Sequence, residues 1–214
     1  MRKFSSFEWV PDFARGHLKE MRVRWALEEA GLPYREMRLT QEEKTGAPYL
    51  KLQPFGQVPC FEDGEVSMFE SGAIVLRIAE QSEALMPRDA QGRARTMSWV
   101  FAALNSVEPE VAHLAAIDLF HEGEEWARLR RPGAVENVLH RLRQLAGWLG
   151  DRDYLEDRFT AGDLMMTTVL REVRQEELLR QFPTLRAYRE RCEARPAFRQ
   201  ALADHLAIYA QAAE

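Results

Sequence analysis

The sequence predicts an α+β protein in two parts, an N-terminal domain with the element order β-α-β-α-β-β-α and an all-helical C-terminal domain. Strand and helix patterns alternate over the first ~80 residues, and only helical periodicity follows. A polar stretch containing Pro87 and Gly92 separates the two parts. We therefore expect one domain over residues 1–82, a linker over 83–91 and a helical domain over 92–214.

Composition narrows the classes of function. The 214 residues are 46% hydrophobic and 29% charged, which is typical of a globular protein with a core. No apolar run approaches the roughly 18 residues that span a membrane, and the N-terminus lacks a signal-peptide pattern. The net charge is −5, and the arginines are spread along the chain instead of forming a basic cluster. The five histidines do not have the spacing of metal ligands. We expect no nucleic acid, membrane or metal partner.

The N-terminal elements follow from local patterns. Residues that favour β-structure, or that alternate between two faces, mark the strands. The Asp63-Gly64 pair is a strong hairpin signal. Gly31 closes the first long helical pattern as a C-terminal glycine. We expect strands at residues 2–10, 32–40, 58–62 and 65–69, and helices at 16–31, 47–56 and 71–81.

The C-terminal part reads as helices with one well-specified start. In "FTAGDL", Thr160 and Asp163 occupy the two positions of a capping box, and capping alone explains Asp163. Pro109 should kink or split the first helical pattern. We expect helices at residues 92–120, 133–149, 160–174, 183–194 and 196–209.

The stretch "QPFGQVPCFEDGEVSMFES" places a proline inside a strand-like run and a Glu-Ser pair before a helical pattern. Together with "RVRWALEEAGLPY", the capping box and the domain order, it resembles the cytosolic glutathione transferase superfamily, most closely its bacterial, phi and theta-like members. Gln53 stands where those members usually have Asn. The resemblance implies a thioredoxin-like N-terminal domain, a C-terminal helical bundle, and glutathione as co-substrate.

The resemblance also implies a set of glutathione-binding residues. Family members share a cis-proline at the position of Pro59, which presents the Val58 backbone to the cysteinyl part of the ligand. Glu70 and Ser71 would hold the γ-glutamyl ammonium and carboxylate at a helix N-terminus. Gln57 and Lys44 match positions that contact the rest of the tripeptide.

Three of these residues also have a simpler structural interpretation. Pro59 fits an ordinary trans proline at a strand start, since only ~5–6% of X-Pro bonds are cis in folded proteins. Ser71 fits a helix N-cap, and Lys44 fits a solvated surface lysine.

The loop that should activate the glutathione thiol departs from the family. Relatives place Tyr, Ser or Cys there, whereas "VPDFARGHLKE" contains none of them. Arg15, His17 or the backbone amides of the first helix are possible substitutes. Other nearby candidates are less suitable, since Ser5 and Ser6 lie too early, Trp9 fits a packing role, and Cys60 fits a small buried residue. The missing cysteine argues against a cysteine-based mechanism.

The leading hypothesis is a glutathione transferase that conjugates glutathione to a small apolar electrophile, with a role in detoxification. Alternatively, the fold is a non-catalytic binding or interaction protein, as in the stringent-starvation and elongation-factor-associated relatives. Isomerase or dehalogenase chemistry needs the same thiolate and is not separated from conjugation. Trp99, Phe101 and His113 fit either an electrophile site or the core. The resemblance and the cysteine usage predict a cytoplasmic homodimer, with Phe55 as a possible intersubunit anchor.

Overall fold

The computed structural model describes residues 1–64 and 66–211 and forms two compact units. The first contains Met1–Arg88 and the described residues from Ala194 onward, and the second contains Asp89–Glu193. The last helix therefore groups with the N-terminal unit, whereas the sequence placed it in the helical domain. The first unit also continues to Arg88 instead of ending at residue 82.

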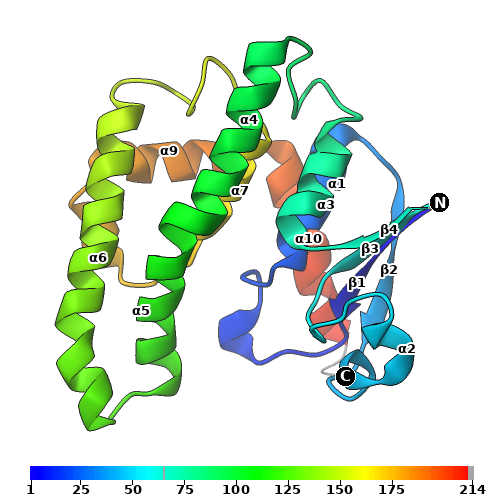
Figure 1. Cartoon of the computed structure of the whole chain (residues 1–214), viewed down its shortest axis with the longest axis horizontal. Coiled ribbons are helices and arrows are strands. Elements are labelled where there is room, and N and C mark those ends of the chain that lie inside the picture. Colours follow the sequence, from blue (N-terminus) through cyan, green and yellow to red (C-terminus); the bar gives the residue numbers. More distant parts are fainter. Residues whose placement is uncertain (65, 212–214) are drawn as a thin grey trace. The chain divides into compact units, whose positions relative to one another are not determined.

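The first unit is built on a four-stranded mixed sheet of order β2-β1-β3-β4 (Figure 1). β1 pairs in parallel with β2, and the β1–β3 and β3–β4 pairs are antiparallel. This is the expected thioredoxin-like arrangement. Glu65, at the start of the fourth predicted strand, lies outside the described residues. The strands are β1 (Arg2–Phe7), β2 (Tyr34–Leu39), β3 (Cys60–Asp63) and β4 (Val66–Phe69).

Helices cover the sheet of the first unit on both faces. Figure 1 shows α1, α3 and α10 together on one side and α2 on the other. The side chains of Phe4 and Cys60 illustrate the two faces, since Phe4 lies against Arg24 of α1 and Cys60 clusters with Tyr49 of α2. The helices are α1 (Glu20–Ala30), α2 (Ala47–Leu50), α3 (Ser71–Ala79) and α10 (Pro196–Gln211), with 3-10 turns η1 (Asp12–Ala14) and η2 (Glu43–Thr45).

Helix α1 is shorter and more deeply buried than its sequence pattern predicts. It begins at Glu20 rather than at residue 16, because the preceding loop closes tight turns such as the bond from the His17 amide to the Ala14 carbonyl. Gly31 ends it in the left-handed conformation, as expected (φ 63°). Every residue from Glu20 to Leu27 is buried, including charged ones, because α1 packs against β1, α3 and α10 together.

The second unit is helical in all its described regular elements, as expected. Its helices are α4 (Ala90–Ala102), η3 (Ala103–Val107), α5 (Glu108–Phe120), α6 (Glu125–Leu149), α7 (Ala161–Arg171), α8 (Glu176–Arg180) and α9 (Pro183–Glu193). The first helical pattern is split by η3, a π-helical turn immediately before Pro109, which confirms the predicted break. No helix in residues 1–64 and 66–211 combines the length and apolarity needed to cross a membrane.

One predicted helix start in this unit is wrong, and one short helix was not predicted. Helix α6 begins at Glu125 and continues through Pro132, although the prediction began at residue 133. Proline removes one backbone donor from a helix interior, yet Pro132 is exposed and the rest of the long helix stays continuous. The short helix α8 was not predicted, because five residues are too few to show a helical period.

The capping box at α7 is present as predicted. The Thr160 hydroxyl accepts from the Gly162 amide at 3.1 Å, and the Asp163 carboxylate accepts from the Thr160 amide at 2.9 Å. Asp163 also accepts from the Leu155 amide and the Tyr188 hydroxyl. This buried carboxylate therefore ties three segments of the unit together, which supports a structural role.

Candidate functional site

The predicted glutathione-binding residues of the first unit gather at one edge of its sheet. β3 and β4 pair with Cys60 opposite Phe69, so the next residues outward, Pro59 and Glu70, leave the hairpin at the same end. β1 is antiparallel to β3, with Phe4 opposite Phe61. Its C-terminal end, where the long loop begins, therefore reaches this edge too. The strand register alone thus brings three predicted segments together.

The Val58–Pro59 bond is cis. The trans alternative considered for Pro59 is therefore wrong, and the family resemblance predicted the isomer correctly.

The loop before Val58 is held by the side chain of Gln53. This residue is buried, and its amide oxygen accepts from the backbone amides of Phe55 and Gln57, at 2.7 and 3.2 Å. A side-chain acceptor that bonds amides two and four residues later closes a turn as Asn does in related motifs. Gln53, which stands where the related sequences usually have Asn, therefore also keeps this loop closed.

Glu70 has a backbone conformation that is rare for a residue with a side chain. Its φ of 71° and ψ of 114° lie outside the regions that L-residues normally occupy. Such a conformation costs about 1–3 kcal/mol and is concentrated at functional sites. Glu70 is exposed and immediately precedes α3, so this residue and the first amides of the helix lie at the same end of the hairpin.

Ser71 is the first residue of α3, but it does not cap the helix. Glu70 is the N-cap residue, and no side chain caps this end. The Ser71 hydroxyl instead accepts a hydrogen bond from the Arg22 guanidinium at 3.2 Å, and both side chains are buried. The capping interpretation of Ser71 is therefore wrong. The hydroxyl proton remains able to donate, because the serine oxygen is the acceptor in the bond from Arg22.

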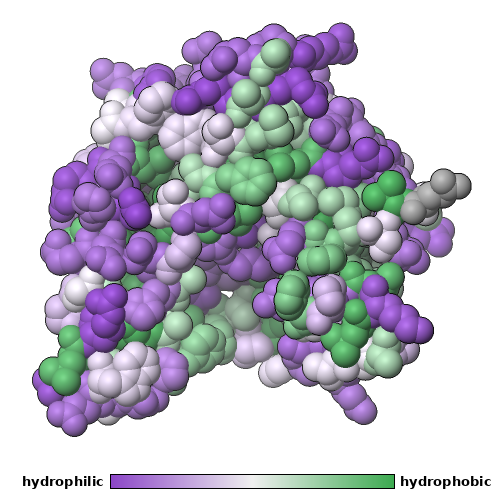
Figure 2. Space-filling model, viewed as in Figure 1, coloured by the Kyte–Doolittle hydropathy of each residue, from purple (hydrophilic) through white to green (hydrophobic). Residues whose placement is uncertain are grey.

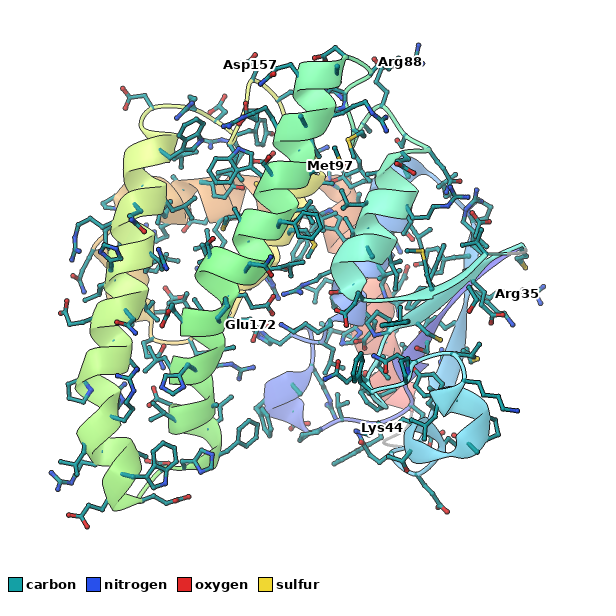
Figure 3. The ribbon with its side chains drawn as sticks, viewed as in Figure 1. Arg35, Lys44, Arg88, Met97, Asp157 and Glu172 are labelled. Carbon is teal, nitrogen blue, oxygen red and sulfur yellow. The ribbon has the colours of Figure 1, made fainter. Side chains whose placement is uncertain are left out.

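Lys44 lies in η2, before α2, and is labelled in Figure 3. Its ammonium group is 5.9 Å from the centre of the Phe7 ring, at the end of β1. The Lys44 carbonyl also lies beside Gly56 of the loop that leads to Val58. The structure thus places this cation at the same sheet edge as the other predicted residues.

Arg15 and His17 lie in the long loop between β1 and α1. The loop is anchored on α10, since Val10 clusters with Ile208 and Tyr209. The Arg15 guanidinium forms an ion pair with Asp12 at 2.9 Å and stacks 5.4 Å from the centre of the Tyr209 ring. His17 is half-buried in the turn that precedes α1.

The two serines of β1 and Cys60 are buried in the first unit and do not line the loop that follows β1. Ser5 and Ser6 are completely buried, and Ser6 donates to Glu36 at 3.1 Å. They lie within β1 rather than in the following loop, as expected from the sequence. Cys60 is also buried, and burial raises the pKa of its thiol. A buried thiol that stays protonated is not the reactive group of this site.

In the second unit, the three candidates for an electrophile site, Trp99, Phe101 and His113, differ in their surroundings. Trp99 donates its indole N–H to Glu156 at 2.6 Å and packs against the exposed Trp148, so it belongs to a partly exposed cluster of the unit. Phe101 is exposed, and His113 is half-buried. Hydrophobic residues, green in Figure 2, also reach the visible surface elsewhere.

A cavity of about 420 Å³ in the second unit is lined largely by polar residues. Arg131 and Asp118, two of its lining residues, form a bidentate ion pair at 2.7 and 3.0 Å. The hydrogen bond from Arg131 lowers the pKa of Asp118. This lining does not resemble an apolar electrophile site.

Comparisons with known proteins bear on the family and the fold of the chain. Residues 13–80 match the family described as "Glutathione S-transferase, N-terminal domain". Over 195 residues the chain is 28% identical to the disulfide-bond oxidoreductase YfcG of Escherichia coli K12, covering 82% of this chain and 86% of that protein. These matches support placing the chain in the cytosolic glutathione S-transferase superfamily.

Solved glutathione S-transferase structures share the fold. A family member from Pseudomonas fluorescens pf-5, with two glutathione bound, aligns with a TM-score of 0.82 at 22% identity over 94% of this chain and 92% of that chain. A transferase from Pseudomonas putida, with one glutathione disulfide bound per subunit, aligns at 0.81 and 20% identity over 94% and 90%. At these identities the likeness shows the fold alone.

Sequence reasoning missed the roles of three residues that shape the candidate site. Arg22 bonds Ser71, Gln53 closes the loop, and Tyr49 donates to the Gln57 carbonyl at 2.7 Å. Gln53 was noticed as a departure from the family, but its role depends on the folded loop. Arg22 and Tyr49 lie in ordinary helical patterns and carry no local signal.

Proposed function

We propose that this protein binds glutathione at the sheet edge formed by Gln57–Pro59 and Glu70–Ser71 and conjugates it to a small apolar electrophile. The observation that carries the proposal is the unusual Glu70 backbone next to Ser71 at the α3 N-terminus. Glu70 and Pro59 are the residues directly outside the Cys60–Phe69 pair, at the same end of the hairpin. Free amides of α3 and the Ser71 hydroxyl suit a carboxylate, and the Glu70 carboxylate suits an ammonium. Both groups occur on the γ-glutamyl residue.

The remaining parts of the tripeptide extend toward the other predicted residues. The Val58 backbone can pair with the cysteinyl residue as an added strand does. The Lys44 ammonium near the end of β1 suits the glycine carboxylate. Together these contacts would direct the thiol toward the loop between β1 and α1.

We assign thiolate stabilisation to this loop, with Arg15 as the first candidate and His17 as the second. A free thiol has a pKa of about 8.5, so a neighbouring cation or N–H donor must lower it for the thiolate to prevail near neutral pH. The Arg15 guanidinium is held by Asp12 and Tyr209, and a guanidinium group offers several N–H donors in a fixed geometry. The resulting thiolate would attack the electrophile directly, as in conjugation, isomerisation or dehalogenation.

A second candidate function is glutathione-dependent disulfide reduction, which the similarity to the Escherichia coli oxidoreductase favours. One glutathione thiolate would attack a substrate disulfide and release one thiolate. A second glutathione would then resolve the mixed disulfide and form glutathione disulfide. Glutathione would supply both thiols, because Cys60 and Cys192 are buried. A non-catalytic glutathione-binding protein is the alternative if the loop does not activate the thiol.

We further propose a cytoplasmic homodimer. Its support is the family, together with the side chain of Phe55, which is 70% exposed on the loop closed by Gln53. A large aromatic side chain on a well-held turn is suited to anchor a protein interface.

The proposed function is tested by titrating reduced glutathione into the protein by calorimetry and recording the ultraviolet difference spectrum of the complex. Binding with a thiolate band near neutral pH is expected, whereas S-methylglutathione should bind without the band. Failure of both ligands to bind would refute the proposal. Binding without a thiolate band would favour the non-catalytic alternative. Turnover of an aromatic halide against turnover of hydroxyethyl disulfide then separates conjugation from disulfide reduction.

A further inference from the structure

A chain of hydrogen bonds lies beneath the segment that the ligand is proposed to contact. Tyr49 donates to the Gln57 carbonyl at 2.7 Å, Ser5 and Tyr49 share a bond of 2.8 Å, and the Cys60 amide donates to the Ser5 hydroxyl at 2.7 Å. Ser5, Tyr49 and Cys60 are buried. The chain thus joins β1, α2 and β3 to both ends of Gln57–Cys60.

The donor in each bond is fixed by elementary chemistry. The Gln57 carbonyl only accepts, so the Tyr49 proton points to it. The Ser5 hydroxyl must then donate to the Tyr49 oxygen, and the Cys60 amide donates to the Ser5 oxygen. Burial raises the pKa of Tyr49, so its hydroxyl stays protonated. Hydrogen bonds that run in one direction reinforce one another.

The direction of the Gln57 carbonyl also sets the direction of the Val58 N–H, because the peptide bond that joins them is planar. The Gln57–Val58 bond is trans, so the Gln57 C=O and the Val58 N–H point in opposite directions. Because the carbonyl points to Tyr49, the Val58 N–H points away from it. Gln57 is exposed and Val58 is half-buried, so this segment lies at the surface.

We propose that Tyr49 is a positioning residue that orients the Val58 N–H toward the cysteinyl carbonyl of glutathione, which rests on the proposed function. Tyr49 acts through the Gln57 carbonyl and does not touch the ligand. Its removal should weaken the contacts of the cysteinyl carbonyl more than those of the ligand's two ends. It should leave Glu70 and Ser71 unaffected, because they belong to a different strand end.

The test compares Tyr49→Phe with the wild-type protein by calorimetry, using glutathione and an analogue whose cysteinyl carbonyl is reduced to a methylene. Tyr34→Phe is the matched control, because the Tyr34 hydroxyl makes a 2.8 Å bond to Glu28 away from this segment. Tyr49→Phe should weaken glutathione binding about 2- to 12-fold, the range for one hydrogen bond. The analogue should bind Tyr49→Phe and wild type equally, and Tyr34→Phe should bind glutathione like wild type.

Other outcomes separate the two proposals. If wild type binds glutathione and Tyr49→Phe binds it equally well, the positioning role is overturned and the proposed function stands. Equal weakening of glutathione and the analogue would mean general loosening, which also overturns the positioning role. If wild type does not bind glutathione at all, the proposed function itself fails. Thermal unfolding of each variant confirms that the comparison is made on folded protein.

Discussion

Replacing Glu20 with glutamine should change how the stability of the protein depends on pH. Glu20 begins α1 and is completely buried, and neither of its carboxylate oxygens has a hydrogen-bond partner in the described part of the chain. His205 of α10 approaches to 3.9 Å, which is beyond hydrogen-bond distance. Burial raises the pKa of the Glu20 carboxyl to about 8, a shift that the Glu20 backbone amide and the charge of Arg24 oppose and that Glu36 increases.

The direction of this pH dependence follows from whether the folded or the unfolded chain keeps the Glu20 proton. Between the ordinary pKa of 4.5 and the folded value of about 8, the native Glu20 keeps its proton while the unfolded chain loses it. The free energy of unfolding therefore falls as pH rises, by up to about 1.4 kcal/mol per pH unit. From pH 5 to pH 7 the Glu20 contribution should fall by roughly 2–3 kcal/mol. Glutamine keeps the shape and removes this dependence.

The measurement is urea unfolding of wild type and Glu20→Gln at pH 5, 6 and 7, with Glu8→Gln as a control at an exposed position. Other groups titrate in the same range, so the informative quantity is the difference between the two proteins. Relative to Glu20→Gln, wild type should lose stability across this range. A difference that stays constant with pH would show that Glu20 is ionised in the folded protein and would refute the reasoning.

Three further predictions concern the site and the second unit. Ser71→Ala should weaken glutathione binding by about 1–2 kcal/mol, or roughly 5- to 30-fold, by calorimetry, while the exposed Ser67→Ala should not. Arg15→Met should raise the pKa of bound glutathione, read from the thiolate absorbance across pH; if only His17→Gln does so, the stabiliser is His17. Thr160→Ala should lower the free energy of unfolding by about 1 kcal/mol through loss of the α7 cap, measured in urea, and an unchanged value would contradict the capping role.

The sequence predicted those parts of the fold whose causes are local. The hairpin follows from Asp63-Gly64, the α7 start from Thr160 and Asp163, and the break before α5 from Pro109. Helix α6 was predicted too short because Pro132 is a strong local signal that the rest of a long helix overrides. The last helix was assigned to the helical domain because no local pattern states which unit a helix packs against.

The same distinction separates the predicted site residues from the missed ones. Glu70 and Ser71 could be proposed as ligand-binding residues from the sequence, because a polar pair before a helical pattern suggests an anion site at a helix N-terminus, and the structure places both residues at the start of α3. Tyr49 and Arg22 could not, because their partners Ser5 and Ser71 lie 44 and 49 residues away in the sequence. Residues that touch a ligand are constrained by its chemistry, whereas residues that hold them are constrained only by the fold. The buried hydroxyl of Tyr49 and the buried charge of Arg22 belong to the second kind, and only the folded structure brings them to the site.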